Sequence, residues 1–170
     1  MKKISIGAEC FLMSIYLQDA VAQAIEAANS LKTAEALSFM EKSSLLLVHT
    51  YQRGGKLLIA GNGGSLCDAM HFAEEMTGQF RKKRRALPAI ALSDPGHMSC
   101  TANDMGFDQV FVRGVEAFGF TKDLFIALTT SGNSENLYKA ILLAKMKGMK
   151  TIAFLGKAAV KSKGYVIWNG

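Results

Sequence analysis

Apolar residues near the amino terminus recur every three or four positions, as they do along one face of an α-helix. The first such stretch carries Phe11, Ile15, Val21, Ala24, Ile25 and Ala28. A second stretch carries Leu37, Met40, Leu47 and Tyr51. The pattern therefore predicts two long helices within about residues 8–53.

After residue 53 the pattern changes to short apolar runs bounded by glycines or polar residues, which are typical of buried strands. These runs occupy residues 56–60, 88–92, 124–128 and 150–155. Polar loops and helical patterns follow the first three runs, and this alternation predicts a parallel sheet with helices on both faces. We therefore expect an α/β fold, a three-layer doubly wound parallel sheet within about residues 54–170. Residues 165–168 are a candidate fifth strand.

The length of 170 residues suits a single domain with a full hydrophobic core, so we expect one domain over residues 1–170. The three cysteines are far apart and odd in number, which fits neither a disulfide scaffold nor a cysteine-rich zinc site. A reducing, cytoplasmic setting is the simplest interpretation. No segment approaches the roughly 20 apolar residues of a membrane span, so we expect no membrane partner.

The net charge of +6 is concentrated in part in one basic block, residues 81–85. Such a block can contact nucleic acid or an anionic substrate, but without interleaved aromatic residues it is more typical of a solvated loop. We therefore predict no nucleic-acid partner. A basic loop near the mouth of a site would instead attract an anionic substrate.

Ligands of parallel sheets bind where the strands end, so the loops there are the places to search for chemistry. The first loop contains Asn62, Gly63 and Gly64, whose backbone can approach a ligand closely and present N–H groups to an anion. It has neither the GxGxxG spacing of a dinucleotide site nor the lysine of a P-loop. The alternative interpretation is a plain strand-to-helix turn with Ser65 as the helix N-cap.

The loop after the third strand carries four hydroxyl groups at the start of a predicted helix: those of Thr129, Thr130, Ser131 and Ser134. Neutral donors at a helix amino terminus can surround a phosphate group without a metal. The alternative is a helix cap rich in Ser and Thr, but one cap uses only one hydroxyl. The loop therefore favours a phosphate site.

Two polar pairs are further candidates for chemistry. His71 and Glu75 stand four residues apart on a predicted helix, so they project from one face as acid–base groups or as two ligands of a divalent metal. The alternative is a solvated polar face, with Glu74 and Glu75 outside. Asn103 and Asp104 are typical of a turn, although Asp104 can also bind a sugar hydroxyl, and nothing local decides between these roles.

Five strings occur together in a recognisable order and spacing: GNGGSLCDAMHFAEEMTGQF, PAIALSD, CTANDMGF, TTSGNS and KGMKTIAFLGK. In this respect the chain closely resembles the sedoheptulose 7-phosphate isomerases, also called phosphoheptose isomerases, of the sugar isomerase (SIS) domain superfamily. The resemblance covers about residues 54–157. It implies an enzyme that converts sedoheptulose 7-phosphate to D-glycero-D-manno-heptose 7-phosphate for lipopolysaccharide synthesis. It also implies a homotetramer with active sites between subunits.

The resemblance also implies roles for individual residues. It places the substrate against Asn62, Gly63, Gly64, Asn103 and Asp104. It places the phosphate against Thr129, Thr130, Ser131 and Ser134, although family members commonly have Ser at the position of Thr129. Glu75 matches the catalytic base, and His71 and Glu75 match positions that bind zinc in some members.

The sequence departs from the family pattern at its end. The family continues with a long C-terminal helix that supplies a Gln and a His, which are the second acid–base group and the remaining metal ligands. This sequence ends at Gly170, before any such segment. It is therefore either part of a longer protein or a SIS-domain protein without the full catalytic machinery, and the alternative function is a non-catalytic sugar-phosphate-binding or regulatory protein.

Overall fold

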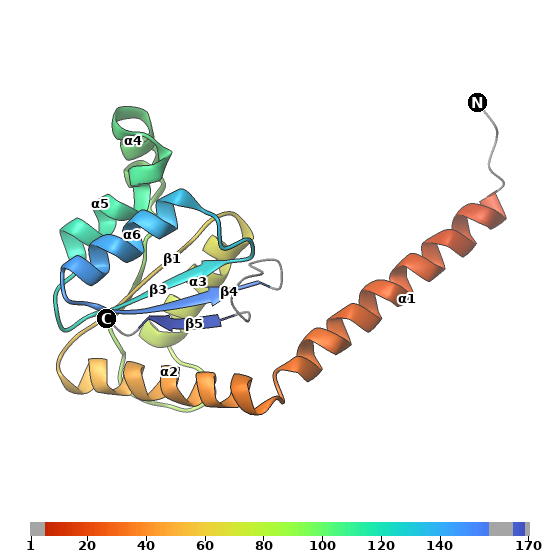
Figure 1. The fold of residues 1–170 in the computed structure, drawn as a ribbon, viewed down its shortest axis with the longest axis horizontal. Helices are drawn as coiled ribbons and strands as arrows, with labels where there is room; N and C mark the ends of the chain where they lie inside the picture. The colour runs from red at the N-terminus through yellow and green to blue at the C-terminus, as the bar shows by residue number, and fades with distance from the viewer. Residues whose placement is uncertain (1–5, 157–164, 169–170) are drawn as a thin grey trace. The chain divides into compact units, whose positions relative to one another are not determined.

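The computed structural model describes the backbone of residues 6–156 and 165–168 and the side chains of residues 13–156 (Figure 1). The helices are α1 (Ile6–Ser30), α2 (Ala34–Gln52), α3 (Gly64–Thr77), α4 (Pro95–Met105), the 3-10 helix η1 (Phe107–Gln109), α5 (Val110–Phe118) and α6 (Glu135–Met146). The strands are β1 (Leu57–Gly61), β2 (Ala89–Ala91), β3 (Leu124–Thr129), β4 (Lys150–Leu155) and β5 (Tyr165–Trp168). The two amino-terminal helices and the alternation of strands and helices are thus confirmed.

The chain divides into two compact units, Met1–Lys42 and Ser43–Gly170. The first contains α1 and the start of α2. There, the Thr33 hydroxyl accepts a hydrogen bond from the backbone N–H of Ala36 (3.2 Å), which satisfies one of the free donors at the start of α2. The second unit contains the whole sheet. No helix in the described part of the chain is long and apolar enough to cross a membrane.

The sheet has the strand order β2-β1-β3-β4-β5. The first four strands are parallel, as predicted, whereas β5 runs antiparallel to β4. A parallel pair needs a crossover of about a dozen or more residues, and the chain between β4 and β5 is shorter than that. The fifth strand therefore returns along the edge in the opposite direction.

The strand order places a topological switch point at the carboxyl end of the sheet. From β1 the chain first adds β2 on one side and later returns to add β3 on the other side. The loops that leave β1 and β3 consequently lead away in opposite directions, and such a switch point is where open α/β sheets bind ligands. The glycine-rich loop and the hydroxyl-rich loop are these two loops.

Helices cover both faces of the sheet. On one face, Leu58 and Phe125 of the central strands are buried beneath α5 and α6, which contribute Phe111 and Leu137 (Figure 1). Because successive strand residues point to opposite faces, Leu57 and Ile59 lie on the other side, where α3 packs on β1 and β2. Burial on both faces explains why the sequence of these strands is continuously apolar.

A buried carboxylate connects the amino-terminal ends of two central strands. Asp123, which is 2 % exposed, accepts hydrogen bonds from the backbone N–H groups of Lys56 and Phe120, each at 2.9 Å. It also accepts one from the Lys56 ammonium at 2.5 Å. These bonds join the start of β1 to the start of β3, at the end of the sheet opposite the glycine-rich and hydroxyl-rich loops.

Candidate functional site

The loop between β1 and α3 is shaped by its glycines. A Cβ on Gly61 would approach the carbonyl oxygen of Ser65 to 2.5 Å, and Gly63 has a φ of +55°. By contrast, a Cβ on Gly63 or Gly64 would meet no atom within 4 Å, so the loop faces open space at these two positions. Within the described residues, the backbone N–H groups of Gly63 and Gly64 have no acceptor. The loop thus presents free donors to an approaching ligand.

Helix α3 begins one residue before Ser65, and its N-cap is Gly63, which makes no side-chain capping bond. The alternative interpretation of the loop, a turn capped by Ser65, is therefore wrong. The positive φ of Gly63 turns the chain directly from the strand into the helix, so Ser65 is already helical.

The loop between β3 and α6 keeps its hydroxyl groups available. Thr129 Oγ1 accepts a hydrogen bond from the backbone N–H of Gly132, and Ser131 Oγ accepts one from that of Asn133, each at 3.2 Å. Both hydroxyls act only as acceptors there, so each can still donate its hydrogen to an anion. The hydroxyls of Thr130 and Ser134 have no partner among the described residues.

The amino end of α6 adds backbone donors to this loop. Its N-cap, Ser134, makes no side-chain capping bond, and within residues 6–156 the N–H groups of Glu135 and Asn136 have no acceptor. The interpretation of the loop as a simple Ser/Thr cap therefore finds no support at Ser134. Free N–H groups and the partial positive charge of the helix end favour a bound anion.

The two strand-end loops are joined by a reciprocal pair of amides. Asn62 Nδ2 donates to Asn136 Oδ1 at 3.0 Å, and Asn136 Nδ2 donates to Asn62 Oδ1 at 2.9 Å. Asn136 is 3 % exposed, and its Oδ1 also accepts from the backbone N–H of Leu137 at 2.9 Å. Asn136 was not a predicted site residue. The signal in the sequence is an asparagine next to Leu137 and four residues before Ala140, on the apolar face of the helix.

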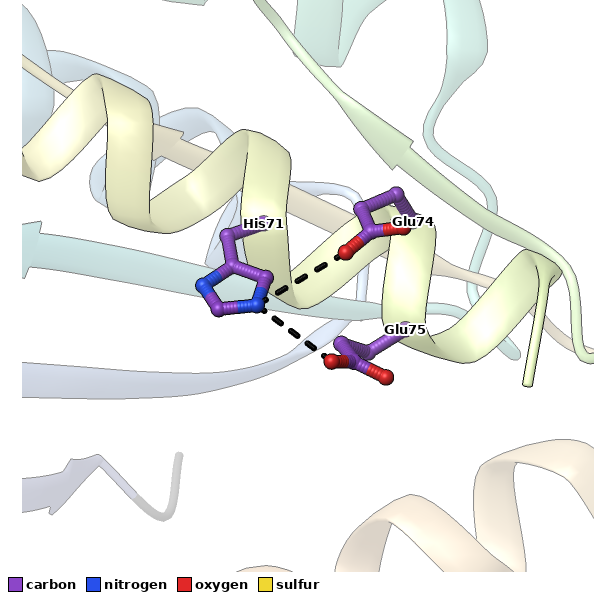
Figure 2. Close-up of side chains that lie close together, drawn as sticks. All are labelled: His71, Glu74 and Glu75. Atoms are coloured by element: carbon purple, nitrogen blue, oxygen red, sulfur yellow. Dashed lines mark hydrogen bonds and ion pairs between the residues drawn. The ribbon is translucent and has the colours of Figure 1, made fainter. Parts of the chain in front are cut away.

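His71, Glu74 and Glu75 lie close together on α3 (Figure 2). His71 Nε2 is 3.3 Å from Glu75 Oε1 and 3.6 Å from Glu74 Oε1. The side chains of His71 and Glu74 are 71 % and 67 % exposed, whereas that of Glu75 is 26 % exposed. One donor atom from each lies within 4.8 Å of the others. The predicted proximity of His71 and Glu75 is present. Glu74, which the alternative interpretation placed with Glu75 on a solvated face, is exposed and lies beside them.

An imidazole nitrogen and two carboxylates fit the donor preferences of a divalent metal such as zinc. Their exposure leaves room for further ligands. The three side chains therefore form a possible group of metal ligands.

Asn103 and Asp104 lie in the last turn of α4 rather than in a turn of their own. Asp94 caps the start of this helix by accepting from the backbone N–H of His97 at 2.6 Å. Asn103 Nδ2 donates to Asp104 Oδ1 at 2.7 Å, and the Cys100 thiol donates to Asp104 Oδ2 at 3.5 Å. This hydrogen bond and the charge of Asp104 raise the pKa of Cys100.

Within the described residues, Asn103 and Asp104 form no hydrogen bond with the two strand-end loops or with His71 and Glu75. The structure of this chain therefore groups Asn62 with the hydroxyl-rich loop, whereas no described hydrogen bond joins Asn103 or Asp104 to that loop. The corner after α4 is tied to α6 instead, by an ion pair between Asp108 and Lys139 at 2.6 Å. The Lys139 hydrogen bond lowers the pKa of Asp108, and the Asp108 bond raises the pKa of Lys139.

The basic block after α3 is an irregular segment, as predicted, but one of its members has a specific structural contact. The Arg84 guanidinium donates to the backbone carbonyls of Glu75, Met76 (2.9 Å) and Arg85 (3.0 Å). Helix carbonyls in the last turn have no intrahelical donor, so Arg84 satisfies two of those in α3.

Comparison with known proteins places this chain in a family. The SIS domain family matches residues 19–156. The phosphoheptose isomerase of Fusobacterium nucleatum is 56 % identical over 124 residues, which are 73 % of this chain and 64 % of that relative. The phosphoheptose isomerase of Haemophilus ducreyi is 48 % identical over 147 residues, or 84 % of this chain and 76 % of the relative. The chain thus spans slightly less than two thirds of the Fusobacterium relative.

Solved structures agree with these sequence matches. The phosphoheptose isomerase GmhA from Neisseria gonorrhoeae superposes with a TM-score of 0.76 at 34 % identity, over 89 % of this chain and 81 % of that one. The phosphoheptose isomerase from Francisella tularensis superposes with a TM-score of 0.74 at 31 % identity, over 91 % of this chain and 81 % of that one. The chain therefore belongs to the SIS domain family and, within it, to the phosphoheptose isomerases.

Proposed function

We propose that this chain carries the sugar-phosphate site of an aldose–ketose isomerase that converts sedoheptulose 7-phosphate to D-glycero-D-manno-heptose 7-phosphate. The product would supply heptose for lipopolysaccharide. The observation that carries the proposal is the junction of the glycine-rich loop with the hydroxyl-rich amino end of α6, through Asn62 and Asn136. The names of the similar proteins support the choice of substrate.

The phosphate of the sugar binds at the amino end of α6 in this proposal. Four hydroxyl side chains lie in the segment that leads into that end, and we assign phosphate contacts to Thr129, Thr130, Ser131 and Ser134. The N–H groups of Glu135 and Asn136 and the helix dipole add attraction for the anion. The sugar then extends toward Asn62, Gly63 and Gly64, whose loop faces open space. Asn103 and Asp104 are assigned to the sugar on the family pattern.

Isomerisation requires a base that moves a proton between two neighbouring carbons. We assign this role to the carboxylate of Glu75. It takes a proton from C1 of the ketose, and the electron pair of the C–H bond forms the C1=C2 double bond of an enediol as O2 gains a proton. Return of the proton to C2, with loss of the hydroxyl proton of O1, gives the aldehyde. A second group carries the proton between O1 and O2, and no described residue is assigned that role.

A metal ion is assigned to the same helix. His71, Glu74 and Glu75 would hold zinc through one nitrogen and two carboxylate groups. Bound zinc would polarise the substrate carbonyl and stabilise the negative charge of the enediolate. The glycine-rich loop and the phosphate loop bind and orient the sugar whether or not the metal is present.

We further propose a homotetrameric, cytoplasmic protein with a single SIS domain. Large apolar side chains along α1 support association, since Met13, Tyr16 and Leu17 are 63 %, 80 % and 60 % exposed. Exposed apolar patches of more than a few hundred Å² are typical of protein–protein interfaces.

The proposal is tested by incubating the purified protein with sedoheptulose 7-phosphate and following the aldose by NMR. We expect turnover by the wild type and a loss of at least about 100-fold in Glu75→Gln, because a general base contributes roughly 10²–10⁴ in rate. Glu116→Gln is the control, since among the described residues this exposed carboxylate pairs with Arg113 of the same helix, α5. Binding of the sugar phosphate without turnover by the wild type would instead favour a sugar-phosphate-binding protein.

A further inference from the structure

Asn136 is a buried polar residue on α6, whose other buried residues are Leu137, Ala140 and Ala144. It is 3 % exposed, and Leu137 beside it is 2 % exposed. A buried amide must find partners, because an unsatisfied donor or acceptor costs stability. Asn136 finds them in two places, the backbone of its own helix and the side chain of Asn62.

These contacts fix which way the two amides face. Asn136 Oδ1 accepts from the backbone N–H of Leu137 at 2.9 Å, and that group can only donate. The oxygen must therefore face the helix backbone, which leaves Asn136 Nδ2 to donate to Asn62 Oδ1. Asn62 Nδ2 in turn faces the Asn136 oxygen. The backbone of α6 thus determines the orientation of an amide in a different loop.

Asn62 keeps part of its hydrogen-bonding capacity free. An amide has two N–H hydrogens and two oxygen lone pairs, and the pair with Asn136 uses one of each. The remaining hydrogen and lone pair consequently point in set directions at the start of the glycine-rich loop. Donors held in place before the substrate arrives need no reorganisation during the reaction.

We propose that Asn136 is a positioning residue, which holds the Asn62 amide in the orientation that meets the sugar and keeps the β1 and β3 loops at a constant spacing. Asn136 itself acts through Asn62. This role rests on the proposed function, because Asn62 is there assigned to the substrate.

A double-mutant cycle tests the role. We expect Asn136→Ala to lower kcat/KM for sedoheptulose 7-phosphate by roughly 10- to 100-fold, as misplaced positioning groups do. In the Asn62→Ala background the same substitution should cost less than about threefold, because its target is already gone. Equal losses in the two backgrounds would show that Asn136 acts only on the fold and would overturn the proposal.

Asn136→Asp serves as a second variant in case the alanine variant unfolds. The carboxylate still accepts from the Leu137 N–H but cannot donate to Asn62 Oδ1. The negative charge of this variant also weakens phosphate binding and so changes KM. The kcat values of the variant and the wild type are therefore compared, and we expect kcat to fall. A wild-type kcat would overturn the proposal. Gln52→Ala is the control: this exposed amide lies at the end of α2, outside both strand-end loops, and we expect the variant to retain wild-type kcat/KM.

An NMR measurement separates this proposal from the proposed function. In ¹⁵N-labelled wild-type protein, the Asn62 side-chain hydrogen that is bonded to Asn136 Oδ1 should exchange with solvent more slowly than the free hydrogen of the same amide, and Asn136→Ala should abolish this protection. Protection that survives the substitution would overturn the positioning role alone. A wild type that shows the protection but neither binds nor converts sedoheptulose 7-phosphate would overturn the proposed function, and with it the role of Asn136 in that reaction.

Discussion

The guanidinium of Arg84 donates a hydrogen bond to the backbone carbonyl of Met76 at 2.9 Å, directly after Glu75 in the last turns of α3. The same guanidinium contacts the carbonyl of Glu75 itself. One member of the basic block therefore stabilises the end of the helix that carries the proposed base.

Removal of this contact should loosen the end of α3. We expect Arg84→Gln to lower the free energy of unfolding by about 1.5–3 kcal/mol, since a hydrogen bond to a charged group contributes roughly this much. The substitution should also lower kcat, because the backbone of Glu75 loses the hydrogen bond that Arg84 donates to its carbonyl. Thermal unfolding and turnover measure the two effects. Lys83→Gln, an exposed member of the same block, is the control, and equal behaviour of the two variants would contradict the assignment.

Tyr51 makes the free energy of unfolding depend on pH in the alkaline range. Burial raises the pKa of this phenol to about 12, against a smaller opposing effect of Arg84. The unfolded chain releases the proton near pH 10, whereas the folded chain holds it, so stability should fall as the pH rises from about 10 to 12. Tyr51→Phe should remove this part of the pH dependence in thermal melts. Tyr138→Phe, at an exposed phenol, should leave it in place.

Tyr51→Phe should also act at neutral pH. The Tyr51 hydroxyl is buried and has no hydrogen-bond partner within the described residues. Removing an unsatisfied buried hydroxyl should raise the free energy of unfolding by about 1 kcal/mol. A free energy of unfolding below that of the wild type would show that the hydroxyl has a partner in the folded protein.

Asp123 should be the most sensitive acidic residue for stability. Asp123→Asn replaces one oxygen by a donor that faces other donors and leaves the Lys56 ammonium without its partner. We expect a loss of about 3–5 kcal/mol in chemical denaturation, which is typical of a broken buried ion pair. Asp19→Asn on α1 is an exposed control and should change stability by less than about 0.5 kcal/mol.

The hydroxyls of the phosphate loop should contribute to affinity. We expect Ser131→Ala and Thr129→Val each to weaken binding of sugar phosphate by roughly tenfold or more, since a hydrogen bond to a charged group contributes about 1.5–3 kcal/mol. Calorimetric titration measures the change. Thr121→Val, whose hydroxyl donates to the Lys147 carbonyl at 3.2 Å, is the control. Unchanged affinity in both loop variants would place the phosphate elsewhere.

Zinc binding should depend on His71. We expect His71→Ala to weaken zinc affinity by at least about tenfold, because it removes the only nitrogen donor of the described group. Competition with a chromogenic chelator measures the affinity. His49→Ala on α2 controls for the general effect of losing a histidine, and equal affinities in the two variants would contradict a metal site on α3.

The periodicity of the sequence predicted most of the fold for a physical reason. The central strands β1 and β3 are buried on both faces, so their residues are continuously apolar, while the helices keep a 3.6-residue pattern. The direction of β5 could not be predicted in this way, because the apolar pattern of a strand is the same in both directions. The length of the connection between β4 and β5 was the informative feature.

The site was predicted less completely, because composition shows residue types but not their partners. The hydroxyl-rich loop and the His71–Glu75 pair were found, since each lies within a few residues along the chain. Asn62 and Asn136 are 74 residues apart, and only the sheet brings them together. Asn103 and Asp104 have strong turn propensity, yet the Asp94 cap starts a helix that continues through both. Their roles, like those of the other site residues, stay predictions.

The Asp123–Lys56 ion pair lies at the opposite end of β1 and β3 from the glycine-rich and hydroxyl-rich loops. It clamps β1 to β3 at one end of the sheet, while the ligand loops leave these strands at the other end. We therefore expect substitutions in these loops to leave the contacts of Asp123 in place. This separation makes the domain a suitable template for directed evolution confined to the two loops.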